Sequence, residues 1–136
     1  MAPATEAAGP RRRRVGPSTL AGALWATLAV KVVRRRLKRR GLAAKIPFPP
    51  RLGPGAERGV RAALRRLSPT CLERALVEQA WLAAAGRPRD VIIGLPPGGM
   101  KDGPAHAWVD GTDPAASAHY LELHRLAPPV RDRAPR

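Results

Sequence analysis

The chain has 136 residues, which limits it to one domain, and its single cysteine excludes an internal disulfide. Its net charge is +15, but eleven Lys and Arg residues lie within residues 1–40, where Glu6 is the single acid. Residues 41–136 hold fourteen basic and nine acidic residues. The charge therefore belongs mainly to the N-terminal segment, and it gives little support for a nucleic-acid-binding surface on the remainder of the chain.

Residues 1–17 contain Ala, Pro, Gly and four consecutive arginines, and we expect them to form a disordered basic arm. Ser18 or Thr19 is predicted to cap the helix that follows. Its apolar face is expected to consist of residues at four-residue spacing, Leu20, Leu24, Leu28 and Val32, with Trp25, Ala29 and Val33 alongside. The uncharged stretch 15–30 is shorter than the roughly 20 residues that span a bilayer. We expect the helix to pack on its own domain or on a partner, and weak contact of residues 18–40 with an anionic membrane surface is the alternative.

Four prolines within residues 41–55 predict a stiff connector, so residues 18–55 comprise a basic amphipathic helix and a Pro-rich connector. Helical spacing resumes over residues 56–67, and a further helix begins near Cys71. Two start signals compete for it: Ser68 followed by Pro69, or Thr70 with Glu73 at capping-box spacing. Either one leaves Cys71 in the first turn, where the helix N-terminus stabilises a thiolate. Cys71 is therefore a candidate nucleophile, and the alternative is a small buried hydrophobic side chain.

Three strands are predicted after this helix, over residues 90–95, 105–110 and 120–126, and a basic tail occupies residues 128–136. On the second strand His106, Trp108 and Asp110 share one face, because side chains alternate along a strand. The predicted fold class is α+β: a minimal domain over residues 56–127 in which the cysteine helix packs on a small antiparallel sheet, with N-terminal helices added. Neither a metal-ligand spacing nor a phosphate-binding Gly loop occurs in the sequence, so no metal and no cofactor are expected.

His106 follows Cys71 by 35 residues, which is enough chain to return a strand to the start of the helix. An imidazole there could act as a base toward the thiol, and a carboxylate would orient it. Asp113 and Asp110 are the candidates for that carboxylate. Asp110 lies about 13 Å from His106 along an extended strand, which favours Asp113 if the chain turns after Gly111. The alternatives are a core histidine at His106 and a turn or cap role for Asp113, with His119 and His124 as further candidates for the base.

Several segments together resemble one protein family: Cys71-Leu-Glu-Arg-Ala-Leu76, Trp81-Leu82, Asp90-Val-Ile-Ile-Gly94 and Ala105-His-Ala-Trp-Val109. They resemble the transglutaminase-like cysteine peptidases of lasso-peptide biosynthesis, the B-type leader peptidases, in the short form that lacks a leader-recognition domain. The resemblance implies a Cys-His-Asp triad of Cys71, His106 and Asp113. In many relatives a longer hairpin precedes the aspartate, whereas Asp113 comes seven residues after His106 here, which indicates a shortened hairpin.

The resemblance further implies a cytoplasmic enzyme that removes the leader from a ribosomally made precursor peptide. Its partners would be that precursor, a leader-recognition protein and an ATP-dependent lasso cyclase, with no specific nucleic acid. An acyltransferase using the same triad is one alternative. The other is a non-enzymatic basic module that binds nucleic acid or an anionic surface through residues 11–40. Five aromatic residues in the whole chain provide little of the stacking surface that single-strand binders use.

Overall fold

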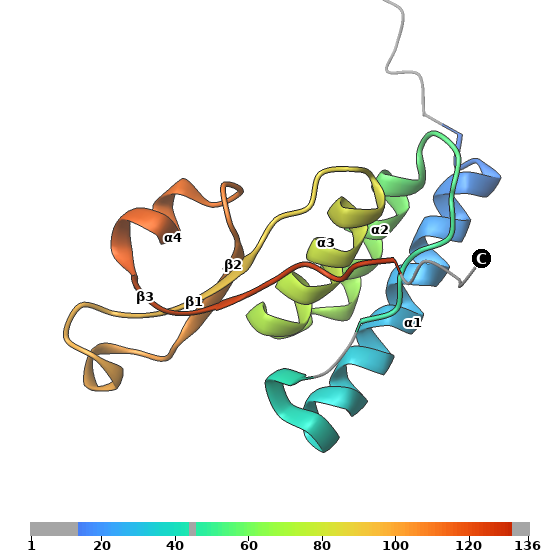
Figure 1. Ribbon diagram of the computed structural model, residues 1–136. Coiled ribbons are helices and arrows are strands. Elements are labelled where there is room, and N and C mark those ends of the chain that lie inside the picture. The colour runs from blue at the N-terminus through green and yellow to red at the C-terminus, as the bar shows by residue number, and fades with distance from the viewer. Residues whose placement is uncertain (1–13, 44–45, 132–136) are drawn as a thin grey trace, which may run out of the picture.

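The computed structural model describes residues 14–43 and 46–131. Most of the predicted basic arm (residues 1–13) and most of the predicted tail (residues 132–136) lie outside the described residues. The elements in chain order are α1 (Pro17–Arg40), η1 (Gly41–Ala43), α2 (Ala56–Leu67), α3 (Cys71–Ala84), β1 (Val91–Leu95), η2 (Met100–Asp102), β2 (His106–Val109), α4 (Pro114–His119) and β3 (Leu121–Leu126). Figure 1 shows these elements as two parts, a group of helices and a sheet that extends from it.

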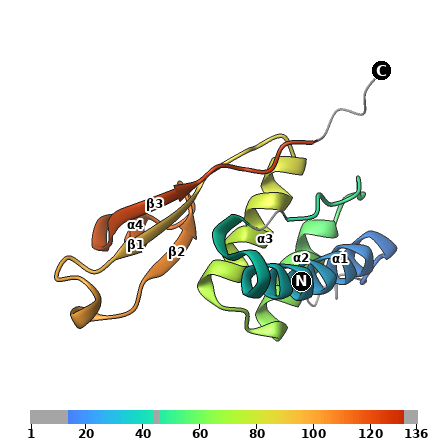
Figure 2. The same cartoon turned by 60° about the horizontal axis from the view of Figure 1, so that its bottom comes forward.

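The sheet has three strands in the order β2-β1-β3, and both neighbouring pairs are antiparallel. Val91 of β1 pairs with Val109 of β2 and with Leu126 of β3, and the pairing with β3 shifts between Ile93 and Gly94. Helix α3 packs against β2 and β1, while α1 and α2 lie on the far side of α3 from the sheet (Figure 2). The arrangement confirms the predicted α+β fold class.

One hydrophobic core joins the helices to the sheet. Its buried members come from α1, α2, α3, β1 and β2, together with Ile46 of the connector: Ala26, Ala29, Val30, Val33, Ile46, Val60, Ala63, Leu64, Ala75, Leu76, Val77, Ala80, Val91, Ala107 and Val109. A second, small cluster on the other face of the sheet consists of Ile92, Trp108 and Ala116, with Tyr120 packed against it. Strand β2 therefore alternates as predicted: Ala107 and Val109 face α3, and Trp108 faces α4.

Helix α1 begins two or three residues earlier than predicted, and it buries only part of the predicted apolar face, including Ala29 and Val33. Gly16 is its N-cap and Pro17 its first residue, so neither Ser18 nor Thr19 caps it; proline suits this first position because its missing N–H needs no acceptor. Leu20, Leu24 and Leu28 of the predicted apolar face are 61%, 61% and 53% exposed. The buried residues are Gly22, Ala26, Ala29, Val30 and Val33. The helix was expected to pack on its own domain, on a partner or on a membrane surface. In the structure α1 packs on α2 and α3 of its own chain.

Small residues explain the choice of face, because they let α1 and α2 approach closely. A Cβ on Gly22 would overlap the backbone carbonyl oxygen of Ala56, and a Cβ on Gly59 would overlap that of Thr19. Leucines at this crossing would hold the two backbones apart, so the leucine face turns outward.

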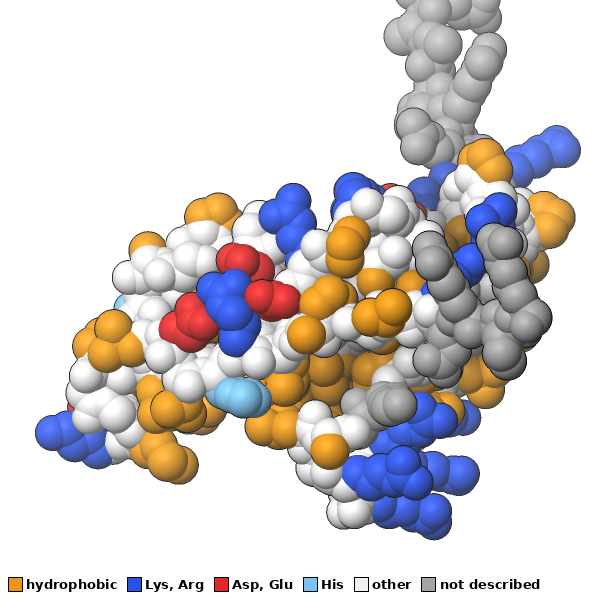
Figure 3. Space-filling model, viewed as in Figure 1, with side chains coloured by type: hydrophobic (Ala, Val, Ile, Leu, Met, Phe, Trp, Pro, Cys, Tyr) orange, Lys and Arg blue, Asp and Glu red, His pale blue; other side chains and the backbone are white. Residues whose placement is uncertain are grey.

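Basic side chains gather at the C-terminal end of α1 (Figure 3). None of the described helices is both long and apolar enough to cross a membrane.

Gly59→Ala is expected to lower the free energy of unfolding by about 2 kcal/mol, because overpacking a crossing costs more than the better helix propensity of alanine returns. Urea unfolding measures the change. Arg58→Ala is the control, since Arg58 is the neighbouring residue of α2 and is exposed. A Gly59→Ala protein as stable as the wild type would contradict the close helix crossing.

Candidate active site

Cys71 is the first residue of α3, directly after the N-cap Thr70. The Thr70 hydroxyl oxygen accepts a hydrogen bond from the backbone N–H of Glu73 at 3.2 Å, and the Glu73 carboxylate accepts one from the backbone N–H of Thr70 at 3.4 Å. Of the two competing start signals, the capping box formed. Ser68 is unavailable as a cap because it ends α2 in the left-handed region, with φ of 44°.

This cap leaves two donors beside the sulfur. The Thr70 side chain satisfies the N–H of Glu73, and the N–H of Arg74 donates to the carbonyl oxygen of Thr70 at 2.9 Å. The first N–H groups of a helix have no intrahelical acceptor, so those of Cys71 and Leu72 remain. Together with the positive end of the helix dipole, they can stabilise a negative oxygen that forms next to the Cys71 sulfur.

An ion pair from α1 holds this end of α3. Glu73 is 5% exposed, and its two carboxylate oxygens accept hydrogen bonds from Nε of Arg34 at 2.9 and 3.2 Å. The hydrogen bond and the charge of Glu73 raise the pKa of Arg34 above its ordinary value. Sequence reasoning missed this pair, because helical periodicity places Arg34 on the polar side of α1 without indicating a partner. The one signal available was that Glu73 lies at helical spacing from the apolar residues Leu76, Val77 and Ala80.

Arg34→Gln is expected to lower the urea concentration at the midpoint of unfolding, because it leaves the buried Glu73 carboxylate without its cationic partner. Urea unfolding at pH 7 measures the loss. Arg35→Gln, at the neighbouring exposed position, is the matched control and should unfold at the wild-type midpoint. Equal destabilisation by the two variants would show that only net charge matters and would contradict the proposed link.

His106 begins β2, where its imidazole is packed against two aromatic rings that also contact each other. The ring centroids are 5.1 Å from Tyr120 and 5.8 Å from Trp108, and both pairs are stacked. Gly94, opposite His106 on β1, keeps this space open, because a Cβ there would lie 2.9 Å from side-chain atoms of Trp108 and of Tyr120. The His106 side chain is 33% exposed. The imidazole thus belongs to a cluster of three rings, while part of it remains accessible to solvent.

Asp113 caps α4 and lies beside the imidazole of His106. The chain turns after Gly111, which has a φ of 78°, and Asp113 becomes the N-cap of α4. Its Oδ1 accepts a hydrogen bond from the backbone N–H of Ala116 at 3.0 Å, and its Oδ2 lies 3.9 Å from Nε2 of His106. That separation exceeds a hydrogen bond, although catalytic contacts are often long until substrate binds. The cap thus fixes the carboxylate beside the imidazole.

Asp110 lies elsewhere, in a charged cluster on the solvent side of the sheet. Its Oδ2 accepts a hydrogen bond from Arg125 of β3 at 3.0 Å, and the same guanidinium binds Asp90 and Glu122. In Figure 3 the basic atoms of this cluster lie among acidic ones over the sheet.

The other two histidines considered as the base lie elsewhere. His119 makes an edge-on contact with the Tyr120 ring, and His124 pairs with Ile93 within the sheet. Neither histidine is among the residues that line the pocket of Cys71.

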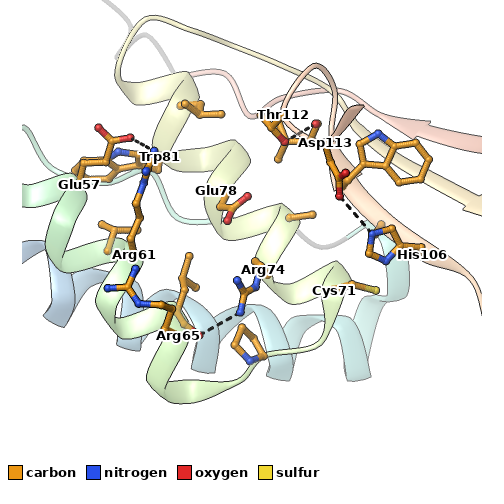
Figure 4. A pocket seen from close by; sticks show the side chains of 18 of the residues that line it. Glu57, Arg61, Arg65, Cys71, Arg74, Glu78, Trp81, His106, Thr112 and Asp113 are labelled. Carbon is orange, nitrogen blue, oxygen red and sulfur yellow. Dashed lines mark hydrogen bonds and ion pairs between the residues drawn. The ribbon is translucent and has the colours of Figure 1, made fainter. Parts of the chain in front are cut away.

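Cys71, His106 and Asp113 line one open pocket of about 830 Å³, which we call the Cys71 pocket. It lies between α2, α3, β2 and the turn before α4, and Figure 4 shows the sulfur of Cys71 directed toward the imidazole of His106. Farther from the sulfur the pocket is lined by charged and apolar residues of α2 and α3: Glu57, Val60, Arg61, Leu64, Arg65, Arg74, Ala75, Glu78, Trp81 and Leu82. Burial raises the pKa of Glu78, and the charges of Arg74 and Arg61 oppose that effect.

These residues provide a thiol at a helix start, an imidazole and a carboxylate, which is the set required for acyl chemistry through a thioester. In the part of the chain that the structure describes, no three His, Cys, Asp or Glu side chains are grouped to hold a metal ion.

A family model described as the transglutaminase-like superfamily matches residues 18–127. Comparisons with curated proteins and with solved structures gave no significant match. The chain therefore belongs to the transglutaminase-like superfamily, whose membership indicates cysteine peptidase or acyltransferase chemistry.

Proposed function

We propose that the protein is a cysteine peptidase that removes the leader from a lasso-peptide precursor, with Cys71 as nucleophile, His106 as base and Asp113 as the group that orients the imidazole. The observation that carries the proposal is that one pocket is lined by all three residues, with the Asp113 carboxylate 3.9 Å from the His106 ring. The membership of the chain in the transglutaminase-like superfamily supports cysteine-based acyl chemistry.

The reaction begins when His106 takes the proton of the Cys71 thiol and the sulfur attacks the scissile carbonyl carbon. The carbonyl oxygen becomes negative and accepts hydrogen bonds from the N–H groups of Cys71 and Leu72, each worth roughly 3 kcal/mol to the transition state. The imidazolium then protonates the departing amine, so the peptide bond breaks and the leader remains on sulfur as a thioester. Water, deprotonated by His106, hydrolyses the thioester and restores the thiol.

The lasso-specific role is supported by the resemblance of residues 68–109 to the short B-type leader peptidases. In that setting a leader-recognition protein presents the precursor. The amine released at the start of the core peptide is then joined to a side-chain carboxylate by the ATP-dependent cyclase. The three partners we propose are therefore the precursor, the recognition protein and the cyclase.

The test is to mix the purified protein with a lasso precursor and its leader-recognition protein and to follow peptide masses. We expect a leader with a free carboxyl end and a core with a free amine. A small amine added to the mixture distinguishes the acyltransferase alternative, which would yield a leader amide in place of the acid. A precursor that stays intact in the presence of its recognition protein would contradict the proposal.

A further inference from the structure

The Cys71 pocket extends along the length of α3, away from the reacting sulfur. Cys71, Arg74, Glu78 and Trp81 all line it and recur on one face of the helix. At 1.5 Å per residue this wall is about 15 Å long. An extended peptide advances about 3.3 Å per residue, so about four residues next to the scissile bond would lie along it. The pocket is long enough to contact substrate side chains as well as the bond that is cut.

Positive charge exceeds negative charge among the residues that line the Cys71 pocket. Arg61, Arg65, Arg74 and Arg87 line the pocket, together with Glu57, Glu78 and Asp113. Glu57 is paired with Arg61 at 3.0 Å, and Asp113 caps α4. Glu78 is half-buried, and burial raises the pKa of its carboxyl while the charges of Arg74 and Arg61 lower it. The four arginines therefore outnumber the three acids that line the pocket.

Arg65 and Arg74 are the two arginines with donors to spare near Cys71. Arg74 follows Cys71 by one helical turn, and its one hydrogen bond within the described residues runs to the carbonyl oxygen of Leu64 at a long 3.5 Å. Arg65, on the facing helix α2, has no ion pair or hydrogen bond within the same part of the chain. Figure 4 shows Arg65 on α2 and Arg74 on α3, the two helices that line this part of the pocket. Two guanidinium groups with free donors form a natural site for a carboxylate.

We propose that Arg65 and Arg74 bind an acidic side chain of the substrate, located within about four residues of the bond that Cys71 attacks. The inference rests on the proposed function and names a feature of its substrate: a peptide with Asp or Glu close to the cleavage site. Trp81 and Leu82 are partly exposed and supply apolar surface in the same pocket, so neighbouring substrate positions would be apolar.

Thiol alkylation tests this directly, because Cys71 is the only cysteine in the chain. The probes are short alanine peptides with one variable residue, Glu, Gln or Lys. One series carries an iodoacetyl group at the N-terminus and the other a chloromethyl ketone at the C-terminus, so both directions along the pocket are sampled. In at least one series, at low salt, we expect the Glu probe to label Cys71 about fivefold faster than the Gln probe and the Lys probe to be slowest.

The variants separate a specific site from general attraction. Arg65→Gln with Arg74→Gln should reduce the Glu-to-Gln rate ratio to about one. Arg66→Gln is the matched control, because Arg66 is exposed on α2 but does not line the pocket, and it should keep the wild-type ratio. Equal rates for all three wild-type probes in both series would overturn the inference, and so would an equal loss of selectivity in Arg66→Gln.

This readout is independent of leader cleavage, since alkylation needs neither a scissile bond nor a recognition protein. Cleavage that proceeds while the probes show no selectivity overturns the inference alone. Selectivity that persists while a lasso precursor stays intact contradicts the proposed function and leaves the carboxylate site standing.

Discussion

Replacing His106 with alanine is expected to slow leader cleavage by about 10³-fold, because the thiol loses the base that activates it and the departing amine loses its acid. The same imidazole acts in both steps of the proposed reaction, so acylation and thioester hydrolysis should both slow. The ring also packs against Trp108 and Tyr120, so the variant must be shown to fold.

Initial rates of core release, followed by mass, measure this effect, and circular dichroism with urea unfolding checks the fold. His124→Ala is the matched control, since His124 is an exposed histidine of β3 that does not line the Cys71 pocket. It should cleave at the wild-type rate. A folded His106→Ala protein that cleaves within threefold of the wild type would contradict the role proposed for the imidazole.

Asp113→Ala is expected to lose both activity and stability, because the two carboxylate oxygens of Asp113 make different contacts: Oδ1 caps α4 and Oδ2 lies beside His106. Loss of the carboxylate beside His106 should lower the cleavage rate by about 10²-fold or more. Loss of the N-cap of α4 should lower the free energy of unfolding by about 1 kcal/mol. Asp113→Asn separates the two effects, because asparagine caps helices well but carries no charge: it should retain most of the stability and little of the activity.

Asp110→Ala distinguishes the two aspartates considered for this role. Asp110 binds Arg125, which keeps Asp90 and Glu122 as partners, so we expect cleavage close to the wild-type rate and a small change in stability. Kinetics and urea unfolding of the four proteins, wild type included, make the comparison. Full activity in Asp113→Ala together with a loss in Asp110→Ala would reverse the assignment.

Local signals predicted much of the fold. The capping box of Thr70 and Glu73 marks the start of α3, and alternation marks the two faces of β2. The apolar face predicted for α1 was right for Ala29 and Val33 but wrong for its three leucines, because periodicity counts apolar residues and takes no account of how closely two backbones approach. Leu20, Leu24 and Leu28 form the larger apolar face, yet the glycine crossing of Gly22 and Gly59 decides which face is buried. That crossing depends on two helices at once and leaves no signal in either one.

The candidate site was predictable where chain order alone brings groups together. Cys71 opens a helix, His106 opens a returning strand, and the turn after Gly111 carries Asp113 back beside the imidazole. The contacts between distant segments were not predictable in this way: Arg34 on Glu73 joins α1 to α3, and Arg65 shares a pocket with Arg74 only because α2 lies beside α3. The catalytic roles of Cys71, His106 and Asp113 stay predictions.

The most direct test of the account is cleavage of a lasso precursor by Cys71→Ala beside the wild type, with the leader-recognition protein in both reactions. The wild type should release the leader and the core, and Cys71→Ala should release neither over the time that the wild type needs for completion. Release of the core by Cys71→Ala at the wild-type rate would show that the sulfur is not the nucleophile and would contradict the account.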